Sequence, residues 1–95
     1  MEIKASGPSE LVISGEILTL EDYMQIRKAI VGLGTLESLT LVILDSSFLG
    51  SAMLGFLLVL VREKNVALSI LVKNEKLLRH LTVLQLLSVF QVKQL

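Results

Sequence analysis

Two continuous apolar runs constrain the fold of this chain most strongly. The first is Leu39–Leu44, with the sequence LTLVIL, and the second is Val66–Val72, with the sequence VALSILV. Neither shows the regular polar–apolar alternation of a half-exposed strand, so both are typical of central strands covered on two faces. A helical pattern from about Ser51 to Lys64 separates them. The arrangement therefore predicts a parallel β-α-β unit.

The amino-terminal segment predicts a β-hairpin followed by a capped helix. The strands are expected at Glu2–Ser6 and Glu10–Ile17, with Gly7-Pro8 as the turn between them. Gly15 lies inside the second strand and indicates a bulge or a close backbone approach. Thr19 is the expected N-cap of the helix, Asp22 is its imperfect capping-box partner, and Gly32 and Gly34 end the helix.

The carboxyl-terminal segment completes the pattern. Asn74 is the expected cap of a third helix, Glu75 to about Val83, and the tail predicts a last strand around Val89–Val92. The element order is then β-β-α-β-α-β-α-β. We expect one α/β domain spanning residues 1–95, with a mixed four- or five-stranded sheet packed against three to four helices.

The central helix, from about Ser51, carries apolar side chains on more than one side. The stripe expected to pack on the sheet is Leu54, Leu57, Leu58 and Val61, and the second apolar side is Met53, Phe56 and Leu60. A helix that is apolar all round is usually buried all round. We therefore expect the second side either to meet a partner protein or to be covered by the neighbouring helices, and the sequence leaves both readings open.

Composition argues against several classes of function. Nine basic residues balance nine acidic ones, which gives no footprint for nucleic-acid binding. Cysteine is absent and His80 is the only histidine, so neither a metal site nor a cofactor is expected, and His80 is expected to be a solvated helix residue. No nucleophile with a base within reach is recognisable, so we expect no enzyme.

The hydrophobic fraction of 53% raises the question of a membrane. The apolar run Phe48–Val61 is shorter than the roughly 18–20 residues that a spanning helix needs. The first residues, MEIKASGPSE, lack the basic start and the following apolar stretch of a signal peptide, so they do not resemble one. We therefore expect a bacterial-style cytoplasmic protein, without membrane insertion, whose surplus apolar area meets another protein.

The order and spacing of several motifs resemble a STAS domain, the fold of bacterial anti-sigma factor antagonists. Gly15-Glu16-Ile17 matches a family signature, although Leu18 stands where the family has aspartate. Asp45-Ser46-Ser47 matches the end of the central strand, and Phe48–Leu58 fits the frame of the helix that follows. The resemblance extends over nearly the whole chain, from Leu11 to Val92.

The resemblance implies a phosphorylated serine, but this chain departs from the family there. In the frame set by Met53-Leu54-Gly55, the serine is replaced by Ala52 and the preceding aspartate by Gly50. Ser51 is the nearest substitute, and it also fits an ordinary N-cap. A second alignment reads Asp45–Gly50 as the motif itself, which would make Ser47 the phosphorylated residue.

The resemblance implies a protein-binding role in regulation of transcription. The expected partner is a serine kinase that is also an anti-sigma factor, or a related switch protein, and formation of a homodimer stays open. The residues expected to contact the partner are Ser46, Ser47, Gly50, Ser51, Ala52, Met53 and Phe56. The alternative is a STAS-type structural subunit of a membrane transport ATPase, which would need no serine switch.

Overall fold

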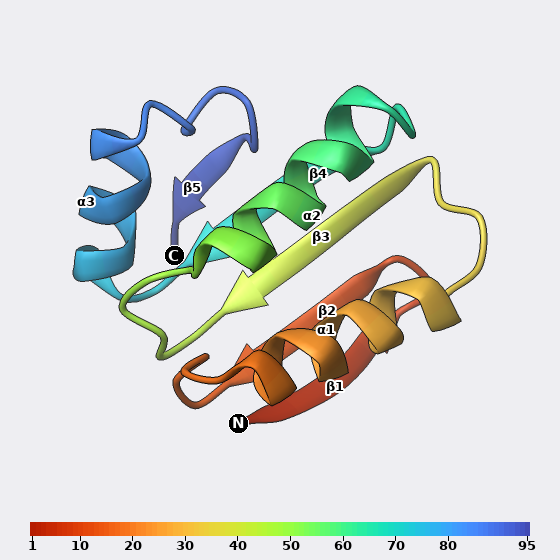
Figure 1. The fold of residues 1–95 in the computed structure, drawn as a ribbon, viewed down its shortest axis with the longest axis horizontal. Helices are drawn as coiled ribbons and strands as arrows, with labels where there is room; N and C mark the ends of the chain where they lie inside the picture. Colours follow the sequence, from red (N-terminus) through yellow and green to blue (C-terminus); the bar gives the residue numbers. More distant parts are fainter.

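Five strands and three helices follow one another in the order predicted from the sequence (Figure 1). The computed structural model describes residues 1–95. The elements are β1 (Glu2–Gly7), β2 (Glu10–Ser14), α1 (Leu20–Gly32), β3 (Ser38–Ile43), α2 (Ser51–Arg62), β4 (Ala67–Val72), α3 (Glu75–Val83) and β5 (Val92–Gln94). The α/β class and the mixed sheet are confirmed. The last strand begins three residues later than the expected Val89, because residues 87–91 form turns.

The strands lie side by side in chain order, β1-β2-β3-β4-β5. β1 and β2 form the antiparallel hairpin, and every later pair is parallel. Each crossover therefore steps to the next position in the same direction. Since such crossovers are right-handed, successive steps in one direction place their helices on one face of the sheet. Figure 1 shows α1 and α2 in front of the sheet, as this rule requires.

Burial along the strands shows that only one face of the sheet is covered. The buried strand residues alternate and lie on the helix side: Leu11, Ile13, Leu39, Leu41, Ile43, Leu68, Ile70 and Val72. On the opposite face, Val12, Val42 and Leu71 pair across three strands and are half-buried. The expectation that Leu39–Leu44 and Val66–Val72 are covered on two faces is therefore wrong. The molecule has two layers, and the core lies between them.

The buried face of α2 differs from the expected stripe. Met53 and Leu57 are its buried residues, whereas Leu54, Leu58 and Val61 are only half-buried. The expected second side is covered in part, because the ring of Phe56 packs edge-on against Tyr23 of α1, with centroids 6.3 Å apart. Of the expected second side, Met53 is buried, while Phe56 and Leu60 are half-buried beside α1. None of the three helices combines the length and apolar character needed to cross a bilayer.

The ends of α1 and α3 confirm the predicted caps. The Asp22 backbone N–H donates to the Thr19 hydroxyl at 3.1 Å, and the Asp22 carboxylate accepts from the Thr19 backbone N–H at 3.1 Å, so the capping box is complete. At α3, the Asn74 side chain accepts from the Lys76 backbone N–H at 2.8 Å. Gly34 takes a left-handed φ of 87° directly after α1. These local signals were therefore sufficient to place both helices.

The Asp22 carboxylate should make folding stability depend on pH. The backbone N–H of Leu18 and then that of Thr19 donate to it, and these bonds lower the pKa of Asp22 from its usual 3.8. A lowered pKa in the folded state stabilises the fold above the unfolded-state pKa, and this contribution is lost as pH falls through the folded-state value. We expect Asp22→Asn to be less stable than the wild type at pH 7. Urea unfolding should show the two converging below pH 3.8; a constant difference would contradict this account.

β2 ends at Ser14, three residues before the expected Ile17, so Gly15 follows the strand and does not lie inside it, but the expected close backbone approach is present. The φ of Gly15 is 86°, and an added Cβ would lie 2.9 Å from the Cα of Met1. We expect Gly15→Ala to destabilise the fold by about 1–3 kcal/mol, measured by urea unfolding. Gly34→Ala is the matched control, because Gly34 has nearly the same φ and nothing within 4 Å of the added atom. Equal losses in both variants would show that the contact with Met1 contributes nothing.

Candidate functional site

The loops that follow β2 and β3 meet at the start of α2. Parallel strands end at the same edge of a sheet, and ligands of open α/β sheets bind outside that edge. We call residues 15–19 and 44–50 the carboxyl-edge loops. Of the seven residues expected to contact a partner, Ser46, Ser47 and Gly50 lie in these loops, and the other four lie in α2. Hydrogen bonds of the Glu16, Asp45, Ser46 and Asn74 side chains connect the loops to one another.

Ser46 has a structural role inside the site. It is 0% exposed, and its hydroxyl accepts from the Ile17 backbone N–H at 3.1 Å while it donates to the Phe48 carbonyl at 2.9 Å. The expectation that Ser46 contacts a partner is therefore wrong. An unpaired buried donor costs about 1–3 kcal/mol, so this hydroxyl is needed where Ile17 enters the core.

Glu16 is a site residue whose role the sequence analysis missed. Its carboxylate accepts from the backbone N–H of Ser47 at 3.1 Å and lies 3.4 Å from the Ser47 hydroxyl. Ser47 is therefore held beside a carboxylate, which would repel a phosphate attached to it. The only signal for Glu16 was its place in the Gly15-Glu16-Ile17 signature, and its partner lies 31 residues away in the chain.

Asp45 lies two residues after the end of β3 and bonds to two neighbouring loops. Its carboxylate accepts from the Gly15 backbone N–H at 2.6 Å, and its carbonyl accepts from the Asn74 side chain at 2.9 Å. The same Asn74 caps α3. Asp45 thus connects the loops after β2, β3 and β4. The carboxyl-edge loops are consequently held by side-chain hydrogen bonds in addition to the sheet itself.

The start of α2 presents small side chains. Gly50 is the N-cap and supplies no side-chain bond, so the expectation that Ser51 caps this helix is wrong. Ser51 and Ala52 are exposed at the first two helical positions. Met53 is 1% exposed and belongs to the core, so its predicted role in contacting a partner is also wrong. The exposed hydroxyl of Ser51 is the most accessible polar group of this helix start.

Exposed apolar side chains surround this helix start. Leu18 is 65% exposed, Leu20 is 66% exposed and Phe48 is 39% exposed. They line a hollow of about 220 Å³ together with Ile17, Thr19, Tyr23, Gly50, Ser51, Ala52 and Met53. We call Leu18, Leu20 and Phe48 the apolar rim. The exposed apolar surface of the molecule therefore includes this loop region.

His80 contacts the loop that carries Phe48 of the apolar rim. Its Nε2 lies 3.2 Å from the Leu49 carbonyl, and its ring packs edge-on against Phe48 with centroids 6.3 Å apart. His80 is half-buried, so the expectation of a solvated residue is wrong. A single histidine on an exposed helix face gave no signal for this contact. The contact connects α3 to the loop between β3 and α2.

Hydrogen bonds hold the carboxyl-edge loops in place, and the surface that they form with α2 exposes the Ser51 hydroxyl. The polar side chains of this surface bond to the loops that carry them, and the apolar rim faces outward. No three His, Cys, Asp or Glu side chains lie where they could share a metal ion. Comparison with protein-family models, curated proteins and solved structures found no match to this chain. Inference about function therefore depends on geometry and on the motifs described above.

Proposed function

We propose that this protein is a non-catalytic, cytoplasmic regulatory module that binds a partner protein, in the manner of STAS-domain anti-sigma factor antagonists. The observation that carries the proposal is the apolar rim beside the start of α2. Exposed apolar groups that gather in this way are characteristic of interaction surfaces, and an exposed aromatic ring such as Phe48 is enriched in them. The motifs that resemble the STAS family lie at the same edge of the sheet.

The contact surface is proposed to comprise the rim together with Ser47, Gly50, Ser51 and Ala52. Ser46 and Met53 shape this surface from below, and Phe56 faces α1. The hydrogen bonds of Glu16, Asp45 and Ser46 hold the loops in one arrangement before binding. Such preorganisation lowers the entropy lost on association.

Ser51 is the proposed position for regulation by phosphate. Ala52 has no hydroxyl, and Ser47 lies beside the Glu16 carboxylate. A phosphate on Ser51 would lie at the amino terminus of α2, where backbone N–H groups favour negative charge. Incubation with a captured kinase and ATP, followed by mapping of the modified residue, tests this assignment. Phosphate on Ser47 would contradict it.

The second candidate is a structural subunit of a membrane transport ATPase. The observation that favours it is the exposed Ala52, because a permanent contact needs no phosphorylated side chain at this position. The same apolar rim would then form a constitutive interface. The two candidates therefore share a surface and differ in the partner.

Capture from source cells, with the bound proteins identified by mass spectrometry, tests both candidates. Phe48→Glu places a charge in the rim, and Val83→Glu is the matched control, because Val83 is an exposed apolar residue at the far end of α3. A kinase bound by the wild type and by Val83→Glu, but lost with Phe48→Glu, supports the regulatory module. A transport ATPase with the same pattern supports the second candidate. Binding unaffected by Phe48→Glu would contradict the proposed surface.

A further inference from the structure

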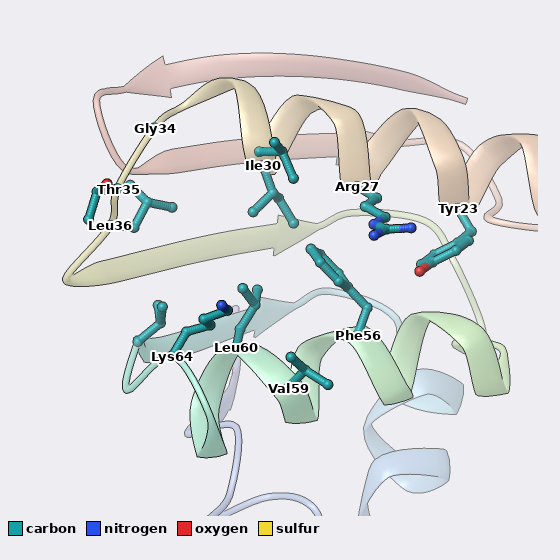
Figure 2. Close-up of a pocket in the computed structure, with 12 residues that line it drawn as sticks. Tyr23, Arg27, Ile30, Gly34, Thr35, Leu36, Phe56, Val59, Leu60 and Lys64 are labelled. Carbon is teal, nitrogen blue, oxygen red and sulfur yellow. The ribbon is translucent and has the colours of Figure 1, made fainter.

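A groove runs between α1 and α2, away from the carboxyl-edge loops (Figure 2). Its volume is about 790 Å³, which lies within the roughly 300–1,000 Å³ typical of small-ligand sites. The lining residues are Tyr23, Arg27, Ile30, Val31, Gly34, Thr35, Leu36, Phe56, Val59, Leu60, Lys64 and Val66. Only Tyr23 is shared with the hollow at the apolar rim. The groove is therefore a second concave surface, separate from the proposed partner site.

The charged residues of the groove are both cations. Arg27 and Lys64 are the only titratable lining residues apart from Tyr23, and no carboxylate lines the groove. The remaining side chains are mostly aliphatic. This combination is complementary to a molecule with one acidic group and an apolar body.

Arg27 is held where it can receive that acidic group. Its guanidinium carbon lies 5.6 Å from the centre of the Phe56 ring, and Tyr23 packs edge-on against the same ring. Figure 2 shows the guanidinium and the Tyr23 hydroxyl both turned into the space between the helices. A guanidinium matches the two oxygens of a carboxylate, and the phenol can donate one further hydrogen bond.

Beyond Phe56, the groove offers apolar walls for a chain. Ile30 and Val31 of α1 line it on one side, and Val59 and Leu60 of α2 line it on the other. Leu36 lies at the far end (Figure 2). Lys64 is at the same far end, where its methylene stem can extend the wall while the ammonium stays in water. The polar and apolar parts are thus arranged along one axis.

We propose that this groove binds a single-chain anionic amphiphile, with its carboxylate on Arg27 and its aliphatic chain between α1 and α2. The charge complementarity of Arg27 and the continuous apolar walls carry the assignment. This site is independent of the partner surface, so either proposal can fail while the other stands.

Dodecanoate below its micellar concentration is the probe. Titration calorimetry should show saturable binding at one site, and amide shifts in NMR spectra should map to α1, α2 and residues 34–36. Decanoate should bind about tenfold more weakly, because two fewer methylenes are buried. Dodecanol and dodecyltrimethylammonium, which lack the negative charge, should also bind at least tenfold more weakly.

Arg27→Gln and Lys64→Gln form a matched pair, since each removes one cation from an exposed position in the same groove. We expect Arg27→Gln to weaken dodecanoate binding about tenfold and Lys64→Gln to weaken it less than threefold. Val59→Trp fills the groove from a partly exposed position and should abolish binding, while thermal melts show that all three variants fold.

Four results would overturn the proposal. The first is equal binding of dodecanoate and dodecanol, and the second is equal losses in the two cation variants. The third is amide shifts that map to the apolar rim. The fourth is a dimer in sedimentation experiments that Val31→Glu converts to a monomer, because the groove would then be a contact between two copies of this chain.

Discussion

Replacing Met53 with glutamate should unfold the domain. Met53 is 1% exposed and belongs to the cluster of buried residues between α2 and the sheet. The substitution removes a core side chain, at about 2–5 kcal/mol, and adds the cost of a buried carboxylate without a partner. The sum approaches the about 5–15 kcal/mol that stabilises a whole small domain. Circular dichroism should therefore show loss of the cooperative thermal transition.

The adjacent variant Ala52→Glu is the control. Ala52 is exposed, and its position in the first turn of α2 favours a negative charge. We expect this variant to stay folded, with a melting temperature close to that of the wild type. A folded Met53→Glu variant would mean that Met53 is more accessible than the structure shows.

Phe90→Ala should have the second-largest effect. Phe90 is a fully buried aromatic residue, and it lies in the turn segment between α3 and β5. Truncation of a buried phenylalanine costs about 3–5 kcal/mol, because it leaves a cavity as well as losing buried area. We expect the midpoint of urea unfolding to fall accordingly. β5 should also exchange its amide hydrogens faster, since only the three residues Val92–Gln94 pair with β4.

Val89→Ala is the comparison for this variant, because Val89 is the half-buried neighbour in the same segment. It removes fewer atoms from a less buried position and should lower stability much less than Phe90→Ala. Similar losses of folding stability in the two variants would show that Phe90 contributes no more than its neighbour Val89.

The fold could be predicted well from local patterns. The capping box at Thr19 and the cap at Asn74 are contained in a few neighbouring residues, and both are present as expected. The alternation of apolar strands with helices was enough for the element order. It did not show how many faces of the sheet the helices cover, because Val42 and Leu71 on the uncovered face are as apolar as the buried residues beside them. Only the strand order shows that all the helices lie on one side.

The sequence predicted part of the candidate site but not the contacts that hold it. The sequence predicted a contact surface at the loop after β3 and the start of α2, and Phe48 of the apolar rim lies there, but Leu18 and Leu20 come from the loop after β2 and the start of α1. The roles of Glu16 and Ser46 depend on partners about thirty residues away in the chain, which only the parallel pairing of β2 with β3 brings together. Met53 was placed on the wrong side of α2, because nearly every position of that helix is apolar and the pattern has no clear phase.

The strands of the sheet lie side by side in chain order, and this order indicates a route by which the polypeptide can fold. No strand has to be inserted between two that are already paired. Each new strand can therefore pair with the edge strand of the part that is already folded. The hairpin of β1 and β2 needs the shortest loop closure and is the natural starting point. Such a chain can build its native contacts progressively from the amino-terminal end as the ribosome releases it.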